Sequence, residues 1–165
     1  LFLLYSMIQA IRETDFTAYI NTEANRIDTS VSSGQIRHLA KFINDLDGAV
    51  FYAYARAETI NNRYTKLEYR YFLVPNMYDG EINLIPAGYF KYELYEISWI
   101  GAVSLTAITA PATETDVLPA NPLAGVVQGL VAIGKLYLGE KAGSEEVQYT
   151  EYTPPATDNT IYYGQ

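Results

Sequence analysis

The chain holds few side chains that could take part in catalysis. His38 is its only histidine, it lies inside a strand-like stretch at 36–44, and there is no cysteine. Catalysis near neutral pH usually needs a group that exchanges protons there, an activated nucleophile or a metal ion. A single histidine within a strand is more often a hydrogen-bonded sheet residue than a catalytic base. We therefore expect His38 to be structural, and the absence of cysteine excludes disulfides and cysteine-ligated metals.

Carboxylates are the remaining candidates for catalysis or metal binding. Asp45 and Asp47 lie in the segment NDLDG as at the start of a calcium loop, but Arg56 occupies the position where an EF-hand requires glutamate. A hairpin turn explains the same two aspartates. Glu93 and Glu96 resemble the paired acids of a glycosidase, but their spacing on one strand directs them to opposite faces. We predict no catalytic residue, no metal and no cofactor, and rank a carboxylate-dependent hydrolase last.

The charge of the chain limits its class of partner. The 165 residues include 19 acidic and 11 basic side chains, so the formal net charge is −8. Nucleic-acid backbones and anionic membrane surfaces attract lysine and arginine, so neither is expected as the main partner. No stretch reaches the roughly 18 apolar residues that span a bilayer. The opening LFLLYSMIQA resembles the apolar part of a signal peptide, but no basic segment precedes it, and we favour a buried first strand.

Tyrosine is the unusual component of the composition. The chain has 16 tyrosines but only 6 phenylalanines. Tyrosine suits strands and half-buried surfaces, because its ring packs while its hydroxyl stays hydrated, and it is enriched in protein–protein interfaces. A β-protein with tyrosine-rich sheet faces is the favoured interpretation, and a dedicated tyrosine-lined binding surface is the alternative.

Hydrophobic alternation and turn signals predict an all-β fold. The segments 36–44 and 49–57 flank an Asp-Gly turn and are expected to form a hairpin. Further strands are expected at 63–72, 81–85, 88–99, 126–140 and 147–153, with shorter ones near the N-terminus. Such closely spaced short strands, about eight or nine in all, are typical of an antiparallel β-sandwich. We expect an immunoglobulin-like or jelly-roll-like sandwich with extended terminal arms.

Two of the expected strands depart from simple alternation. Alternate apolar residues from Phe90 to Leu94 share one face, but Ile97 and Trp99 fall on the opposite face. A β-bulge, or exposure of the last two side chains to a partner, explains the change. The segment 126–140 is apolar at both parities, which predicts a strand covered on both faces.

We expect one domain that comprises residues 1–165. The stretch 104–125 holds three of the seven prolines and no basic residue, and it is interpreted as a long loop inside that domain. The single strand expected after it could not form a core alone. Residues 1–34 are interpreted as an arm, and 153–165 as an extended tail that begins with proline.

The candidate interaction surface combines one sheet face with the two ends of the chain. Tyr89, Tyr95 and Trp99 are expected on the same face of one strand. Packing of this face against a second sheet or a neighbouring subunit is favoured, and stacking of a sugar is the alternative. The complete set of candidates is Leu1, Phe2, Leu3, Leu4, Tyr5, Tyr89, Tyr95, Trp99, Tyr162 and Tyr163.

Several strand-like segments carry a resemblance to a known group of proteins. They are HLAKFINDLDGAVFYAYA, ETINNRYTKLEYRYF, INLIPAGYFKYELYE, GVVQGLVAIGKLYLGE and VQYTEY, within the range Arg37 to Tyr152. These segments resemble small β-sandwich proteins encoded among the structural genes of tailed bacteriophages, of the crAss-like kind and the kind that infects marine Bacteroidetes. The polar stretch before residue 35 departs from that pattern.

The resemblance implies a virion component without enzymatic activity, assembled in the host cytoplasm. Its partners are then other virion proteins, in many copies of a symmetric assembly, and neither nucleic acid nor a membrane. A capsid decoration or auxiliary protein, or a protein associated with the head–tail connector, is the expected function. The alternative is a receptor- or carbohydrate-binding module of a tail or head fibre.

Overall fold

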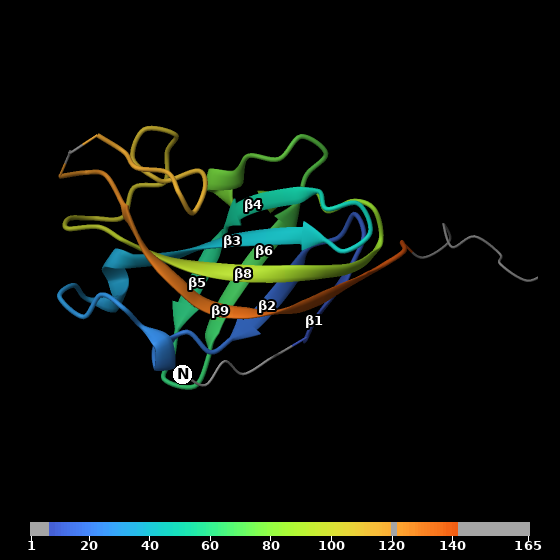
Figure 1. Ribbon diagram of the computed structural model, residues 1–165, viewed down its shortest axis with the longest axis horizontal. Helices are drawn as coiled ribbons and strands as arrows, with labels where there is room; N and C mark the ends of the chain where they lie inside the picture. Colours follow the sequence, from blue (N-terminus) through green and yellow to red (C-terminus); the bar gives the residue numbers. More distant parts are fainter. Residues whose placement is uncertain (1–6, 120–121, 142–165) are drawn as a thin grey trace, which may run out of the picture.

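The structure, a computed structural model, describes residues 7–119 and 122–141. Nine β-strands form two sheets that pack face to face, and the described residues contain no α-helix. Figure 1 looks onto the larger sheet, with the smaller sheet behind it. The prediction of a two-sheet β-protein is confirmed, but the predicted antiparallel pairing holds only for most of the strands, because the larger sheet includes one parallel pair.

The larger sheet has five strands, and the smaller sheet contains the other four. Across the larger sheet the order is β1 (Met7–Ile11), β9 (Val126–Gly139), β8 (Gly88–Ser98), β3 (Ile36–Asn44) and β4 (Val50–Tyr54). All neighbours in it are antiparallel except β1, which runs parallel to β9. The expected hairpin is formed by β3 and β4.

The smaller sheet is built around one central strand. Its strands are β2 (Phe16–Ile20), β6 (Thr65–Tyr71) and β5 (Ala57–Ile60), and the two-residue β7 (Glu81–Ile82) lies parallel to the end of β6. Short 3-10 turns are η1 (Glu23–Asn25), η2 (Ser33–Gln35) and η3 (Met77–Asp79). Residues 7–34, expected as an arm, therefore contribute β1 and β2 to the two sheets.

The main core lies between the two sheets and follows the alternation of the strands. Leu67 and Tyr69 of β6 face Phe42 of β3 and Tyr92 of β8, and all four are buried. Each fully buried side chain of this size contributes about 1.5–3 kcal/mol to stability. The ring of Tyr92 lies over Gly134 of β9, where an added Cβ would be 2.5 Å from the ring. Glycine at this position is therefore required by close packing.

The predicted irregularities of two strands differ from those of the structure. The register shifts between β8 and β9 leave the extra residues, Val131 and Gln128, in β9, whereas β8 pairs with β3 in one unbroken register. The prediction of a bulge in β8 is therefore wrong, and the change of apolar face reflects burial of Ile97 and Trp99 in a second core. The prediction that β9 is covered on both faces is wrong for its second half, because Lys135 and Tyr137 are exposed. None of the residues that the structure describes forms a second layer over that part of the sheet. The strand expected at 147–153 lies outside the described residues.

A second, smaller core lies on the outer face of the five-stranded sheet. It joins Leu39 of β3, Tyr54 of β4 and Ile97 of β8 with Trp99 and Ala110 of the β8–β9 connection. This connection, residues 99–125, folds back over one end of the sheet (Figure 1). The described residues of the stretch predicted as a long loop do form a loop. This loop also covers the second core.

Among the described residues, the structure contains no helix long and apolar enough to cross a membrane.

Candidate functional site

A groove of about 980 Å³ opens at the end of the sandwich that carries the β8–β9 connection. Clefts of roughly 300–1,000 Å³ are typical of sites that bind ligands or short segments of a partner. One wall is the loop segment 114–119, and the other comprises 122–125 and the first residues of β9. Tyr95 and Ile100 complete the lining. This groove is therefore made mainly by a loop rather than by strands.

The lining of the groove is mostly apolar and exposed. Val117 is 89% exposed, Ile100 is 80% exposed, and Val126 at the start of β9 is 55% exposed. Single exposed apolar side chains are common on protein surfaces, but a group gathered around one hollow marks a contact site. This arrangement suits an apolar segment of another molecule.

Trp99 holds the base of the loop in place. Its backbone N–H donates to the carbonyl of Gln35 at 2.9 Å, and its indole Nε1–H donates to the carbonyl of Thr109 at 3.2 Å. The same carbonyl accepts the N–H of Gly125 at 2.7 Å. A Cβ on Gly125 would lie 2.6 Å from the indole ring, so only glycine fits there. Both ends of the loop are thereby tied to one buried ring.

A charged cluster fastens the middle of the loop to the sheet. Glu114 accepts hydrogen bonds from Lys41 Nζ of β3 and from the hydroxyl of Tyr52 of β4, each at 2.5 Å. The hydrogen bond with Glu114 raises the pKa of Lys41. Burial opposes ionisation of Glu114, but the bonds from Lys41 and Tyr52 outweigh it, so the pKa of this carboxyl is lowered. We call Lys41, Tyr52 and Glu114 the loop latch.

Replacing Glu114 by glutamine is expected to lower the free energy of unfolding by about 1–2 kcal/mol near neutral pH, because a charge-assisted bond is lost. A lowered carboxyl pKa stabilises the fold above the ordinary value of 4.5 and ceases to do so as pH falls through the folded-state value. The raised pKa of Lys41 stabilises the fold below 10.5, and this contribution is lost as pH rises through the folded-state value. The latch therefore acts between these limits.

Urea unfolding at neutral and acidic pH measures this effect. The difference between wild type and E114Q should shrink as the pH falls below the folded-state pKa of Glu114. E140Q is the matched control, since Glu140 forms an exposed ion pair with Arg12 at 3.4 Å and should cost little. Equal losses for E114Q and E140Q, or a difference that does not depend on pH, would show that the latch does not hold the loop.

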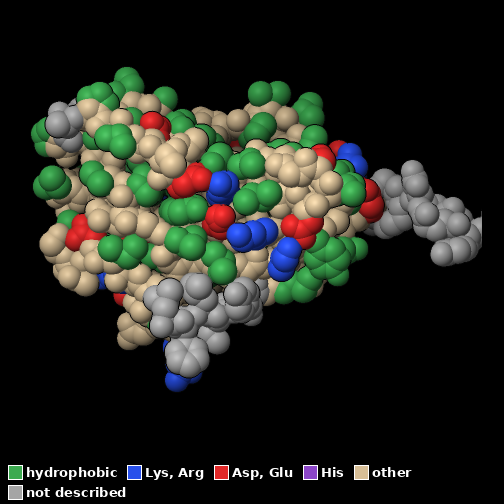
Figure 2. Space-filling view, in the orientation of Figure 1, with side chains coloured by type: hydrophobic (Ala, Val, Ile, Leu, Met, Phe, Trp, Pro, Cys, Tyr) green, Lys and Arg blue, Asp and Glu red, His purple; other side chains and the backbone are tan. Residues whose placement is uncertain are grey.

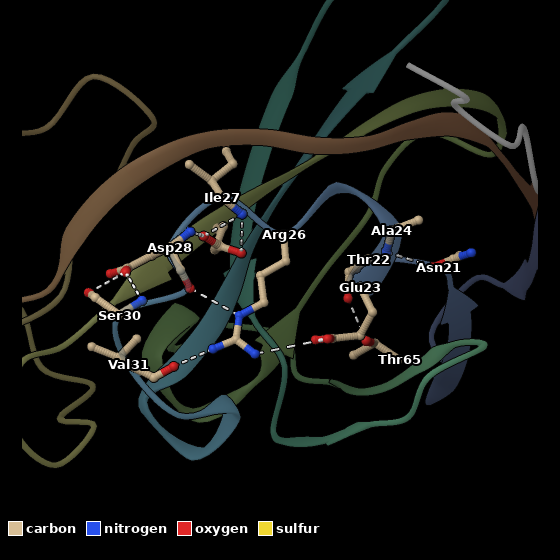
Figure 3. Close-up of polar contacts among 11 residues, drawn as sticks. Asn21, Thr22, Glu23, Ala24, Arg26, Ile27, Asp28, Ser30, Val31 and Thr65 are labelled. Carbon is tan, nitrogen blue, oxygen red and sulfur yellow. Dashed lines mark hydrogen bonds and ion pairs between the residues drawn. The ribbon is translucent and has the colours of Figure 1, made fainter.

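The β2–β3 connection, residues 21–35, lies at the same end of the sandwich and is held by a buried carboxylate. Glu96 of β8 accepts the backbone N–H of Asp28 at 2.8 Å and that of Ile27 at 3.2 Å. Figure 3 shows this connection, in which Ser30 bends back onto the side chain of Asp28. The hydroxyl of Ser98 donates to the other oxygen of Asp28 at 2.8 Å. The loop is thus fixed to β8 by side chains of the sheet.

Arginine and threonine side chains complete the fixation of this connection. Arg26 Nε donates to the carbonyl of Asp28 at 3.0 Å, and a second nitrogen of the same guanidinium donates to the carbonyl of Val31 (Figure 3). Nearer to β2, the hydroxyls of Thr22 and Thr65 share a buried hydrogen bond at 2.6 Å. These bonds satisfy polar groups of a loop that has no regular secondary structure beyond short turns.

The structure engages His38, Glu93 and Glu96 with different partners. His38 is buried, and its Nδ1 is hydrogen-bonded to the carboxylate of Glu58 on β5, away from the groove. Glu93 instead accepts a bond from the hydroxyl of Tyr95 at 2.9 Å on the outer face of the sheet. Glu96 is engaged with the β2–β3 connection, so the two glutamates do not converge. The structural interpretation of His38 agrees with this geometry.

The two aspartates of NDLDG form a turn. The carboxylate of Asp47 accepts the N–H of Ala49 at 2.9 Å, and that of Asp45 forms an ion pair with Lys135 at 2.6 Å. Gly48 adopts a φ of 73°, the left-handed conformation that this hairpin turn requires. Within residues 7–119 and 122–141, no group of three or more His, Cys, Asp or Glu side chains is arranged to hold a metal ion.

The structure separates the aromatic residues predicted to form one surface. Trp99 is only 1% exposed because the β8–β9 connection folds over it, so its assignment to an exposed surface is wrong. Tyr95 is half-buried and lines the groove. Tyr89 is 52% exposed at the opposite end of β8. The remaining candidates, Leu1, Phe2, Leu3, Leu4, Tyr5, Tyr162 and Tyr163, lie outside the described residues.

No protein-family model matches the chain, and neither curated proteins nor solved structures match it.

Sequence reasoning missed the groove and the loop latch. Lys41 and Glu114 are 73 positions apart, and no local pattern connects them. The signal that was present is the run of apolar and proline residues with few charges between 117 and 126. Such a run in a long loop indicates burial or contact rather than a solvated linker.

Proposed function

We propose that this chain is a non-enzymatic structural protein of a tailed-phage virion that acts through protein–protein contacts. It either decorates the capsid as an auxiliary protein or associates with the head–tail connector. The observation that carries the contact function is the exposed apolar groove made by the β8–β9 connection. The virion setting comes from the resemblance of the strand segments to phage structural proteins.

We also propose that the sandwich is of the immunoglobulin-like kind rather than a jelly roll. The order β9-β8-β3-β4 opposite β2-β6-β5 supports this, because it corresponds to strands G-F-C-C′ opposite B-E-D of variable-type domains. In that correspondence the β2–β3 and β8–β9 connections lie at the end that commonly carries binding loops. The likeness is one of architecture and does not by itself specify a function.

The charged groups of the groove favour contact over catalysis. The lining contains two carboxylates, those of Glu114 and Asp116. Glu114 is held by Lys41 and Tyr52, and Asp116 accepts the N–H of Ala112 at 3.0 Å. Both therefore brace the loop. An occupant would meet a mainly apolar surface with a polar rim, which is the usual construction of a protein interface.

Acidic substitutions in the groove should remove the protein from the assembled particle. In V117E/V126E two exposed apolar side chains become charged, so folding is unaffected while an apolar interface is disrupted. We expect the copy number per purified virion, measured by quantitative mass spectrometry, to fall at least about tenfold.

L46E/V74E is the matched control, because Leu46 and Val74 are 82% and 81% exposed and lie outside the lining of the groove. This variant should be incorporated normally. Absence of the wild-type chain from purified virions would contradict the virion assignment. Normal incorporation of V117E/V126E would contradict the role of the groove.

A receptor- or carbohydrate-binding module is the second candidate. The observation that favours it is a pair of exposed tyrosines on the outer face of the five-stranded sheet. Tyr89 of β8 and Tyr137 of β9 are register partners, and their ring centroids are 5.0 Å apart.

A further inference from the structure

The outer face of the five-stranded sheet carries a second surface, distant from the groove, with a different chemistry. Tyr89 and Tyr137 face each other across β8 and β9, and Lys91 and Lys135 are the next same-face pair along these strands. We call these four residues the tyrosine–lysine platform. Figure 2, in the same view as Figure 1, shows Lys, Arg, Asp and Glu side chains crossing this face beside hydrophobic ones.

The two rings of the platform are available to a ligand. Tyr89 is 52% exposed and Tyr137 is 38% exposed. Their planes are inclined by 55°, so both rings cannot lie flat against one planar ligand. The pair instead forms a shallow notch, in which one ring stacks on a ligand and the other ring meets its edge.

The platform carries two exposed lysines, and each of them is paired with one carboxylate. Three of the five lysines, Lys41, Lys91 and Lys135, lie on this face, although the net charge of the chain is −8. Lys91 and Lys135 are directly opposite each other, and like charges in that position are destabilising. Glu93 lies 3.7 Å from Lys91, and Asp45 lies 2.6 Å from Lys135. Partly exposed ion pairs of this kind contribute little to stability, so an anionic ligand can exchange with these carboxylates.

We propose that the platform binds an anionic saccharide. The C–H face of a sugar ring stacks on a tyrosine, while its carboxylate or sulfate group accepts charge-assisted hydrogen bonds from Lys91 and Lys135. Gln9 of β1, the register partner of Tyr137, is exposed and supplies an amide for sugar hydroxyls. Nucleic acid is disfavoured, because the net charge of −8 opposes the approach of a long polyanion.

This inference deepens the second candidate function, carbohydrate binding, and is independent of the groove. Its residues share none with the lining of the groove. Virion incorporation tests the groove and saccharide binding tests the platform, so a failure of one proposal is distinguishable from a failure of the other.

Isothermal titration calorimetry of the full chain with four probes tests the proposal. The probes are an oligogalacturonate, which carries carboxylates, a sulfated dextran oligosaccharide, neutral maltopentaose and an oligothymidylate. We expect one or both anionic saccharides to bind, and maltopentaose and the oligonucleotide to bind at least about tenfold more weakly. The first two probes distinguish a carboxylate ligand from a sulfate ligand.

Two variants of the platform separate its two chemistries. Y89A/Y137A removes the stacking faces, and K91Q/K135Q removes the charge while keeping long polar side chains. Each should weaken binding of the anionic saccharide at least about tenfold. The control is Y19A/Y64A, an exposed tyrosine pair of the other sheet with ring centroids 5.5 Å apart, which should bind as wild type. Circular dichroism verifies the fold of each variant.

Four outcomes would overturn the proposal. They are no binding of either anionic saccharide, equal binding of maltopentaose, preferential binding of the oligonucleotide, and an equal effect of Y19A/Y64A. If Y89A/Y137A fails to fold, K91Q/K135Q still tests the proposal. The two lysine side chains are exposed, so their replacement should not affect folding, and weaker binding would report the loss of the charge contact alone.

Discussion

Replacing Trp99 by alanine is expected to lower the free energy of unfolding by about 3–5 kcal/mol, the usual cost of truncating a buried tryptophan. The side chain is the largest in the core beneath the β8–β9 connection, where it contacts Ile97 and Gly125. Its removal also leaves the Thr109 carbonyl without the indole donor. Both effects act on the loop that forms the walls of the groove.

Urea denaturation followed by circular dichroism measures this loss. Tyr89→Ala is the matched control, since Tyr89 is an aromatic residue of the adjacent strand β8 but is 52% exposed. We expect its cost to be about 1 kcal/mol or less. A cost of Trp99→Ala no greater than that of the control would show that the second core does not contribute to the fold. Faster proteolysis within 99–125 in W99A would confirm that the loop has been released.

Replacing Glu96 by alanine is expected to have the next largest effect, a loss of about 3 kcal/mol, since hydrogen bonds to a charged group contribute about 1.5–3 kcal/mol each. The carboxylate is 1% exposed and accepts the N–H groups of Ile27 and Asp28. Without it these two donors lose their partner, and the β2–β3 connection is no longer fixed to β8. Hydrogen exchange of the two amides should accelerate together.

Glu96→Gln separates hydrogen bonding from charge. Glutamine retains one acceptor oxygen of similar position, so we expect a smaller loss of about 1–2 kcal/mol. Glu93→Ala is the control from the same strand, because Glu93 contacts Lys91 and Tyr95 on the outer face. If Glu96→Ala costs no more than Glu93→Ala, the carboxylate does not organise the loop.

These two residues explain why the loop end of the sandwich can present a defined groove although it has little regular structure. Trp99 holds the β8–β9 connection through its ring, and Glu96 holds the β2–β3 connection through backbone N–H groups. Gln35 joins the two connections, because its side-chain amide donates to the carbonyl of Ile100 at 2.6 Å. The geometry of this end therefore depends on Glu96 of β8 and on Trp99 directly after it, both of which are inaccessible.

The sequence by itself determined most of the strands and their inward faces, although it missed β5. Alternation of apolar and polar residues is a local record of which side of a strand is buried, and it was sufficient for Leu67, Tyr69 and Tyr92. The Asp-Gly turn fixed the β3–β4 hairpin for the same reason, since both strands are neighbours along the chain.

Only the tertiary structure decided which surfaces are covered. The sequence pattern gave Trp99 the same apolar signature whether a loop or a partner covered it, and the fold of residues 99–125 made it a core residue. The meeting of Lys41 with Glu114, the parallel pairing of β1 with β9 and the contact of Tyr89 with Tyr137 likewise join distant parts of the chain. Such contacts depend on the packing of the whole chain, which local periodicity does not encode.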